Sequence, residues 1–351
     1  MIGKEKLRFL TFLFNYVATL KKILGKVPPK ILRQIVFSNL GAPSKRVLVG
    51  PGIGVDNTVI AVNGVKIVVS SDPVTGAKKN LGRIGVDVST NDVALTGARP
   101  EFLLVVLILP AGTRDSQIQR IMREVSTEAK RLGVSIVGGH TEYSSIVENP
   151  VFIGTAIGWT KRRRLVTSSG AKPGENIVMM GEAGVEGTAI LASDLAEKLV
   201  EKGVPPMILR RANRLVKSLS VVKPALISAD YVSAMHDPTE GGVLGGIFEI
   251  CEASGKGCVV NMEAIPVREE TRIICGKLGI DPLRLVSSGT LLATVSKRKT
   301  PILLRKLNEK GFKAHIIGRV TGNKRERIGL MGVREIKIDE LPQDELWKTL
   351  S

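Results

Sequence analysis

The stretch Ser89-Thr90-Asn91-Asp92-Val93-Ala94-Leu95-Thr96-Gly97-Ala98-Arg99-Pro100 places a carboxylate in the middle of a predicted helix of small residues. Its small and apolar residues recur at the i, i+3, i+4, i+7 spacing of a buried helix face. Asn91 and Asp92 lie at the edge of that face. Because a buried carboxylate needs a metal ion, another cation or several donors, we expect Asp92 to serve a function.

Three further polar segments interrupt apolar, strand-like runs in the same half of the chain. They are Gly54-Val55-Asp56-Asn57, Ser70-Ser71-Asp72 and Gly138-Gly139-His140-Thr141-Glu142. Mg²⁺ is usually held by one or two carboxylates together with phosphate oxygens. We therefore predict that Asp56, Asp72 and Asp92 bind Mg²⁺ and that the four segments meet around a phosphate. For Asp72 the alternative is a turn at a strand end.

The loop Gly50-Pro51-Gly52-Ile53-Gly54 follows a short predicted strand and is rich in glycine. Backbone N–H groups in such loops can surround phosphate oxygens, which makes Gly52 and Gly54 candidates for cofactor contacts. We also expect Asn57, which follows the loop, to contact the cofactor. The loop lacks the Gly-Lys-Ser/Thr ending of a P-loop. A flexible turn without a ligand is the equally open alternative.

His140 follows two glycines at the end of an apolar run, with an acid two positions later. Glycines allow another group to approach the backbone closely, so we expect Gly138, Gly139 and Thr141 to face the ligand as well. A lone histidine is more often structural. We nevertheless predict that His140 faces the site and donates a hydrogen bond to phosphate or transfers a proton.

The second half of the chain carries one strong motif, His236-Asp237-Pro238-Thr239-Glu240-Gly241-Gly242. Asp237 or Thr239 can cap the helix that follows, and a helix N-terminus is also a site for anions. Simple capping explains one of these residues but not all of them. The stretch Ser287-Ser288-Gly289-Thr290 is either a turn or part of the lining of a substrate cleft.

The length and amino-acid composition indicate the number of domains, the kind of core and the cellular compartment. The chain has 351 residues, 43% of them apolar but only 4% aromatic, which predicts two domains with aliphatic cores. Three scattered cysteines, Cys251, Cys258 and Cys275, form no paired framework and fit a reducing, cytoplasmic location. None lies near two histidines at ligand spacing, which argues against a zinc site.

The net charge of +18 is compatible with a basic surface, an anionic substrate or a nucleic acid. The densest basic run, Lys161 to Arg164, has no interleaved aromatic residues, which disfavours nucleic-acid binding. Residues 7–20 are apolar but too short to span a bilayer, and they lack a signal-peptide cleavage site. We expect no transmembrane segment; a helix on the protein body or on a partner is favoured over a membrane-surface helix.

The predicted elements divide the chain into four parts. Residues 1–45 form a basic helical extension, 46–160 and 170–330 form two α+β domains, and 331–351 form a C-terminal tail. The expected elements of the first domain include two strands joined by Asn63-Gly64, the strongest short hairpin signal, and helices over about 80–98 and 114–132. Without a G-x-G-x-x-G between a strand and a helix, a dinucleotide-binding fold is not expected.

Taken together, these motifs resemble the AIR synthase-related superfamily, which includes aminoimidazole ribonucleotide synthetase, selenophosphate synthetase, thiamine-monophosphate kinase and HypE hydrogenase maturation factors. The resemblance runs from about residue 28 to 325 and is carried, in order, by Gly54-x-Asp56, Asn91-Asp92-Val93-Ala94, Gly138-Gly139-His140-Thr141 and Asp237-Pro238-Thr239-x-Gly241-Gly242. The Asp-Pro-Thr-x-Gly-Gly and Ser-Ser-Gly-Thr stretches are nearest to HypE.

The resemblance implies a two-domain α+β fold whose N-terminal sheets pair into a barrel across a homodimer, with a C-terminal α/β sandwich domain. It implies an ATP-dependent enzyme with ATP and Mg²⁺ as cofactors, which phosphorylates an oxygen of a small or protein-borne acceptor that is carboxamide-like or itself phosphorylated. The phosphates and Mg²⁺ would lie against Asp56, Asp72 and Asp92. The segment Asp237 to Gly242, with Thr239, Gly241 and Gly242, would close over the substrate, and Asp237 would orient the acceptor.

The chain departs from its relatives in its cysteines. HypE carries its substrate group on a C-terminal cysteine, whereas this sequence has no cysteine after Cys275 and ends in Lys348-Thr349-Leu350-Ser351. Selenophosphate synthetase has a catalytic cysteine or selenocysteine in its N-terminal arm, whereas this sequence has no cysteine before Cys251. We therefore keep a second hypothesis, a non-catalytic nucleotide-binding protein that assists assembly or hydrogenase maturation. A third hypothesis, an RNA or membrane-surface accessory, rests on charge alone.

Overall fold

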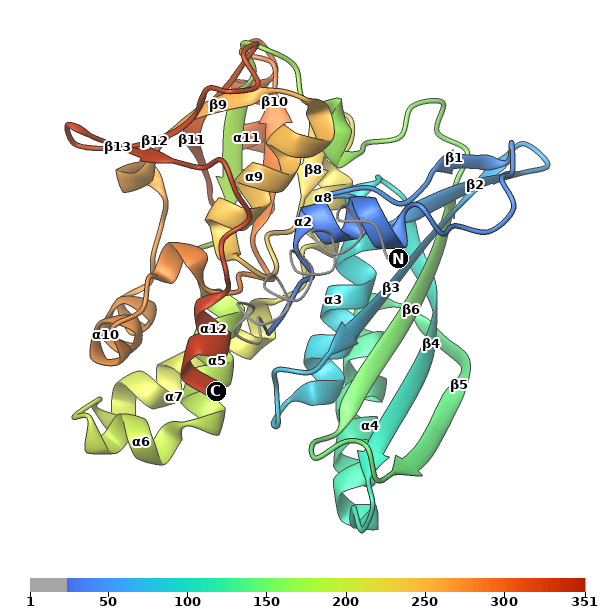
Figure 1. Cartoon of the computed structure of the whole chain (residues 1–351), viewed down its shortest axis with the longest axis vertical. Helices are drawn as coiled ribbons and strands as arrows, with labels where there is room; N and C mark the ends of the chain where they lie inside the picture. The colour runs from blue at the N-terminus through green and yellow to red at the C-terminus, as the bar shows by residue number, and fades with distance from the viewer. Residues whose placement is uncertain (1–23, 351) are drawn as a thin grey trace, which may run out of the picture.

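The computed structural model describes residues 24–350, and these residues form two α+β halves, each built on one mixed sheet. The predicted helix over residues 1–24 lies outside the described residues, apart from Leu24. Figure 1 shows the two sheets at opposite sides of the molecule, with helices between them. The two-domain α+β prediction is confirmed.

The first sheet has the strand order β1-β2-β3-β6-β4-β5 and is antiparallel except for the pair β4 and β5. Asn63 and Gly64 join β2 to β3 with φ angles of 48° and 78°, as a type I′ hairpin turn requires. The strands are β1 (Val47–Val49), β2 (Thr58–Val62), β3 (Val65–Val74), β4 (Arg99–Pro110), β5 (Ser135–Ser144) and β6 (Val151–Thr160).

Two helices, α3 (Leu81–Leu95) and α4 (Asp115–Leu132), cover one face of the first sheet. Helix α3 lies unusually close to β6 because glycines remove the side chains between them. A Cβ atom on Gly85 would lie 2.2 Å from the Phe152 ring, and one on Gly154 would lie 2.1 Å from Ser89 Oγ. Since α8 of the second half packs on its other side, α3 is buried almost all round.

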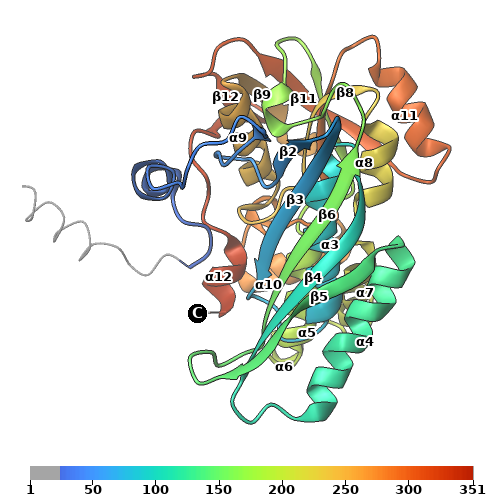
Figure 2. The same cartoon turned by 90° about the vertical axis from the view of Figure 1, so that its right-hand side faces the viewer.

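The opposite face of the first sheet has no helix over it among residues 24–350, as Figure 2 shows. Most of its side chains are nevertheless apolar, although Ser71 and Thr155 form a hydrogen bond there at 2.9 Å. Phe102 and Trp159 are 39% and 44% exposed, and outward-facing neighbours on β3, β4 and β6 are half-buried. Strand β5 lies at the edge with its residues largely exposed. Such a face, apolar and uncovered, is typical of an interaction surface.

The second sheet has the strand order β13-β12-β9-β11-β7-β10-β8, with one parallel pair, β9 and β12. Its strands are β7 (Asn176–Met180), β8 (Val232–His236), β9 (Gly257–Asn261), β10 (Leu291–Val295), β11 (Ala314–Thr321), β12 (Arg327–Met331) and β13 (Arg334–Lys337). Residues 331–351, expected as a tail, thus contribute an edge strand to this sheet.

Helices cover both faces of the second sheet. Ile247 and Phe248 of α9 pack on one face with Met179, whereas α8 and α11 pack on the other with Val178 and Ala293. Aliphatic side chains dominate both cores, as the composition predicts. The helices are α5 (Val185–Asp194), α6 (Ala196–Glu201), α7 (Pro206–Arg214), α8 (Val222–Ser228), α9 (Gly242–Ser254), α10 (Glu269–Leu278), α11 (Thr300–Asn308) and α12 (Glu345–Leu350).

Both ends of the described chain lie against the space between the two halves. The N-terminal arm passes Gly25 against Trp347 of α12 and Glu240 before the short helical segments α2 (Pro29–Ile31) and η1 (Leu32–Val36). Between residues 24 and 350, no helix is long and apolar enough to cross a bilayer.

We predict that Gly85→Ala lowers the free energy of unfolding by about 2 kcal/mol, because the added methyl group overlaps Phe152 and forces α3 away from β6. Urea unfolding followed by circular dichroism measures this change. The matched control is Gly276→Ala in α10, which meets no atom within 4 Å and should stabilise the protein by about 0.5 kcal/mol. Equal effects of the two substitutions would contradict the packing argument.

Candidate active site

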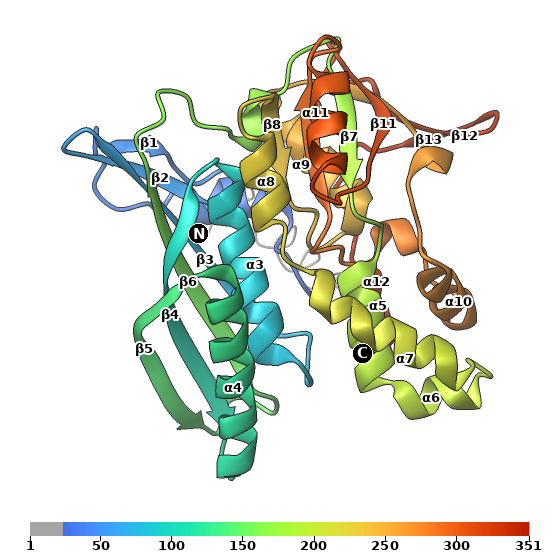
Figure 3. The same ribbon diagram turned by 180° about the vertical axis from the view of Figure 1, so that it is seen from behind.

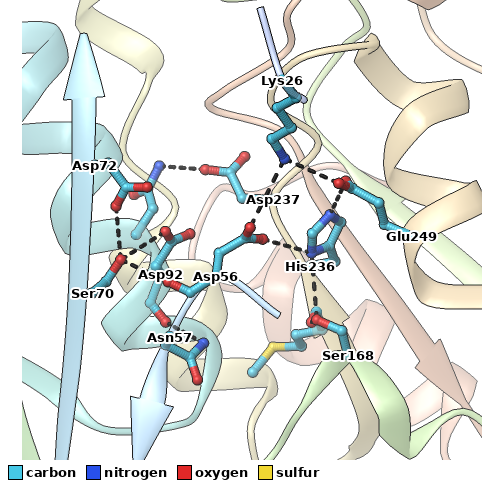
Figure 4. A network of polar contacts seen from close by, with 12 residues as sticks. Lys26, Asp56, Asn57, Ser70, Asp72, Asp92, Ser168, His236, Asp237 and Glu249 are labelled. Atoms are coloured by element: carbon cyan, nitrogen blue, oxygen red, sulfur yellow. Dashed lines mark hydrogen bonds and ion pairs between the residues drawn. The ribbon is translucent and has the colours of Figure 1, made fainter. Parts of the chain in front are cut away.

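Four aspartates from distant parts of the chain meet between the two halves (Figure 4). Asp56 precedes β2, Asp72 lies near the end of β3, and Asp92 lies on α3. Asp237 directly follows β8 of the second half. Asp92 and Asp237 are buried at 3% and 1% exposure, so the site lies below the surface, where charges interact strongly.

Ser70 joins the acids of the first half. Its hydroxyl lies 2.7 Å from Asp72 Oδ2, 3.0 Å from Asp92 Oδ2 and 2.9 Å from the Asp56 carbonyl oxygen. A hydroxyl group has one proton to donate. It can therefore donate to only one of these oxygens at a time. Asp72 and Asp92 thus share one donor and lack a cationic partner in this contact.

The pKa values of these acids follow from burial and mutual repulsion. Burial, with further repulsion from Asp72, Asp56 and Asp237, raises the pKa of Asp92 well above its usual range. Burial likewise raises the pKa of Asp72 to about 6 and shifts the pKa of Asp237 strongly upward. A divalent cation would favour the ionised forms that burial disfavours.

Asn91 ties the two halves together beside this cluster. Its Nδ2 donates to Asp237 Oδ2 at 2.8 Å and to the Leu219 carbonyl at 2.9 Å, and its Oδ1 accepts from Val221 N at 2.8 Å. The amide predicted to bind the cofactor is thus bonded to protein groups. Asn57 Nδ2, also a predicted cofactor ligand, donates to the Asp92 carbonyl at 3.2 Å.

A second polar group, which contains the basic side chains of Lys26 and His236, adjoins the acids. Lys26 Nζ lies 3.0 Å from Glu249 Oε1 and 3.9 Å from Asp56 Oδ1. His236 Nε2 lies 2.8 Å from Glu249 Oε2, and its Nδ1 lies 3.5 Å from Asp56 Oδ2 and 3.4 Å from Ser168 Oγ. Asp56 therefore points toward Lys26 and His236 rather than toward Asp72 and Asp92.

Charge pairing dominates the titration of this group. Burial alone would lower the pKa of His236, but Glu249 and Asp56 more than offset it, so the pKa is raised. Burial would raise the pKa of Glu249, but Lys26 and His236 lower it to about 2. Burial opposes the charge of Lys26 too, yet Glu249 and Asp56 leave its pKa raised. Lys26 and Glu249 are thus charged near neutral pH.

Sequence reasoning missed Lys26, Ser70, Ser168, His236 and Glu249 as site residues. Glu249 could have been found, because it is a charged residue within the apolar run Ile247-Phe248-Glu249-Ile250. His236 stands in the motif that ends β8, so its position was visible in the sequence. Lys26 offered no signal, since one lysine in a basic segment is indistinguishable from a surface residue.

The structure of one chain does not bring the His140 segment to the aspartates. His140 lies on β5, and β4 and β6 separate it from the part of β3 that holds Pro73, next to Asp72. The three strand spacings from β5 through β4 and β6 to β3 put His140 about 14 Å from Pro73. His140 Nε2 contacts Glu142 Oε2 at 3.2 Å on the exposed edge. Gly138 and Thr141 share this exposed strand, so the predicted roles of the segment stay predictions.

Close backbone contacts or positive φ angles account for several glycines of the candidate loops. A Cβ on Gly139 would lie 1.7 Å from the Val105 carbonyl, and one on Gly54 would lie 2.7 Å from the Glu249 carbonyl. Gly241 and Gly242 have φ angles of 82° and 61° at the start of α9. Gly52 forms a narrow turn with Val55. These contacts neither require nor exclude a phosphate.

A small cavity of about 80 Å³ lies beside Thr239, between the halves and α12. Glu186, Glu240, Ser288 and Asp344 contribute polar groups to its lining, and Trp347 contributes its indole ring. Trp347 Nε1 is buried there without a hydrogen-bond partner. Burial raises the pKa of Glu186 to about 7, although Ser288 lowers it in part. A buried donor without a partner requires a water molecule, an ion or a ligand beside it.

The donor chemistry of the acid cluster fits Mg²⁺, which prefers carboxylate oxygens. Asp237 Oδ1 adds a buried oxygen without a partner. Within residues 24–350, however, no three acidic, histidine or cysteine side chains are arranged to hold a metal ion. The side chain of Asp56 would have to turn away from Lys26 before the three predicted ligands could share one ion.

The fold and these motifs define an AIR synthase-like protein. AIR synthase related protein, N-terminal domain, matches residues 54–160, and AIR synthase related protein, C-terminal domain, matches residues 172–330. Carbamoyl dehydratase HypE of Cupriavidus necator is 31% identical over 266 residues, 73% of this chain and 71% of the relative. A hydrogenase expression/formation protein of Methanocaldococcus jannaschii is 29% identical over 311 residues, 85% and 88% of the two chains. The chain belongs to the AIR synthase-related superfamily, and its homologues there are HypE hydrogenase maturation proteins.

Solved structures share the fold at low sequence identity. A HypE in complex with ATP has a TM-score of 0.67 at 22% identity, covering 90% of this chain and 93% of that one. AaThiL complexed with AMPPCP and TMP has a TM-score of 0.70 at 20% identity, covering 91% and 99%. HypE from a HypE–HypF complex has a TM-score of 0.66 at 24% identity, covering 80% and 92%.

We predict that Glu249→Gln lowers the free energy of unfolding by about 3 kcal/mol, because it leaves Lys26 without its main partner. The pKa of His236 should fall, since the carboxylate that offsets its burial is lost. Denaturant unfolding and NMR titration of the three histidines measure both effects. Glu263→Gln, at an exposed position, is the control; an unchanged His236 pKa in Glu249→Gln would contradict the assigned pairing.

Proposed function

We propose that the chain is an ATP-dependent enzyme that transfers a phosphoryl group, with the help of Mg²⁺, to an oxygen of a small or protein-borne acceptor. The single observation that supports this most is the pair of carboxylates Asp72 and Asp92, which share the Ser70 hydroxyl next to Asp56 and the buried Asp237. The ATP complex of a HypE and the AMPPCP complex of AaThiL support nucleotide binding on this scaffold. The C. necator relative is a carbamoyl dehydratase by name, which supports the proposal that this chain is an enzyme.

Phosphoryl transfer needs positioning and neutralisation of charge more than covalent chemistry from the protein. Asp72, Asp92 and Asp56 would hold Mg²⁺, which would offset the negative charge of the phosphates. Lys26 adds a second positive charge at the same place. Asp237 would orient the acceptor, because Asn91 holds one of its oxygens and leaves Oδ1 without a partner.

The small cavity beside Thr239 is where we propose that the acceptor group enters. Its lining combines Glu186, Glu240 and Asp344 with the Ser288 hydroxyl. Three carboxyl groups would repel a phosphorylated acceptor. A neutral, carboxamide-like group, which both donates and accepts hydrogen bonds, suits these partners better.

We predict that Mg²⁺ with a non-hydrolysable ATP analogue raises the melting temperature by about 5 °C at about pH 8 and by much less at about pH 5. The pKa of Asp72 is raised to about 6, so protons displace Mg²⁺ as the pH falls through that value. Differential scanning fluorimetry measures the shift, and ADP release from ATP measures turnover.

Asp92→Asn tests the same site directly. The amide removes one buried charge, so the variant should be at least as stable as the parent without ligand, while losing the Mg²⁺-dependent shift. Asp339→Asn, at an exposed position, should keep it. A full shift in Asp92→Asn would refute the proposed metal site.

We further propose that the protein is a homodimer in which the uncovered face of the first sheet packs against a second copy. The apolar side chains Phe102, Trp159 and their neighbours on this face support the proposal, since exposed apolar faces of this kind usually meet a partner. A second copy is also the route by which His140 could reach an aspartate cluster.

We predict that Phe102→Glu converts the dimer to a monomer, because the charge would be buried without a partner in the interface. Size-exclusion chromatography with light scattering measures the mass. Ile302→Glu on α11 is the matched control, because Ile302 is as exposed as Phe102, at 39%. Identical masses for the two variants would contradict the interface.

The alternative, a non-catalytic assembly or maturation partner, is favoured by the orientation of Asp56, which contacts Lys26 and His236 instead of its fellow aspartates. The HypE–HypF complex supports a protein partner for the fold. ADP release without any added protein would count against this alternative. We also propose a cytoplasmic location, supported by three free, buried cysteines.

A further inference from the structure

A second and larger cavity, of about 540 Å³, opens between the two halves near α4, α8, β7 and β11, elements labelled in the rear view of Figure 3. This volume lies within the range of sites for small molecules. Its lining is strongly basic, with Glu182 as the one acidic residue. The basic residues are Arg131, Lys217, Lys223, Arg268, Lys313 and His315.

Apart from His315, the basic residues fall into two groups. Arg268 is paired with Glu182 at 3.2 Å, and Arg131 contacts Asp87 at 3.3 Å as well as Glu128. Lys217, Lys223 and Lys313 have no ion pair or side-chain hydrogen bond with any residue in the part of the chain that the structure describes. Three exposed lysines without an acidic partner therefore line one concave surface, and such a concentration of positive charge favours an anion there.

The walls of the cavity are formed by closely packed backbone segments. Gly181 and Gly289 have φ angles of 88° and 94°, and a Cβ on Gly289 would lie 2.5 Å from the Ser218 carbonyl. Ser218 and Ser220 also line the cavity, and the Ser220 hydroxyl accepts a hydrogen bond from Val222 N at 3.4 Å. Phe312 is the single aromatic residue there, so the cavity offers charge and hydrogen bonds rather than a platform for stacking successive bases.

We propose that this cavity is a second anion site, which binds a phosphorylated small molecule of about nucleotide size through Lys217, Lys223 and Lys313. It is separate from the aspartate cluster, because the loop from Leu219 to Val221 and the Asn91 side chain lie between them. Without a group of carboxylates, it binds the phosphate directly, with no metal ion.

Asn91 links the cavity wall to the candidate active site. Its side chain bonds both the loop that forms the wall and Asp237.

The test uses isothermal titration calorimetry of the full chain with inorganic pyrophosphate in EDTA, so that metal-dependent binding at the aspartates is suppressed. The parent binds pyrophosphate, and the triple variant Lys217→Glu, Lys223→Glu, Lys313→Glu binds at least about tenfold more weakly, a loss of about 1.4 kcal/mol. The control triple variant Lys297→Glu, Lys324→Glu, Lys337→Glu has the same net charge at exposed positions and binds like the parent.

Two single variants and a single-stranded RNA serve as further tests of pyrophosphate binding at these lysines. If the triple variant does not fold, Lys313→Gln replaces it and binds about threefold more weakly. Asp92→Asn keeps pyrophosphate binding, which separates this site from the proposed catalytic one. Absence of binding by the parent, or equal loss in both triple variants, overturns the proposal. So does a single-stranded RNA that binds through the same lysines far more tightly than pyrophosphate, because that result would define a polymer surface.

Discussion

The cost of burying carboxylates between two sheets is the constraint on which the site depends. Asp92 and Asp237 lie almost without solvent, and Asp72 shares with Asp92 a single hydroxyl donor, Ser70. Each neighbouring polar group can be understood as a response to this cost: Asn91 donates to Asp237, and Lys26 and His236 approach Asp56. The cluster is held together by the fold rather than by its own interactions.

The N-terminal arm changes how this constraint is met. Lys26 and His236 lie between Glu249 and Asp56, so these two carboxylates have basic partners that Asp72 and Asp92 lack. A cation that enters the cluster would compete with Lys26 for Asp56. The arm is therefore part of the site, although it lies in the segment that sequence reasoning treated as an extension of unknown role.

Sequence reasoning located the parts of the site that local patterns encode. Asp92 was visible because a carboxylate is costly among small apolar residues, and the β2–β3 hairpin was visible because Asn63-Gly64 has few other uses. Long-range pairings left no such trace. Nothing in the chain indicated that Lys26 would reach Glu249, 223 positions away, or that Asn91 would bond the loop at Leu219. The position of His140 on an open edge likewise depends on strand order, which spacing does not reveal.

The all-round burial of α3 has a consequence for how the chain can be divided. One side of this helix rests on β6 through Gly85, and its other side is covered by α8 from the second half. Cutting the chain in the connection at residues 161–171 and separating the pieces would expose α3 and leave Asn91 without three bonds. The two halves are distinct in architecture, but because they share the burial of α3 we expect them to unfold together.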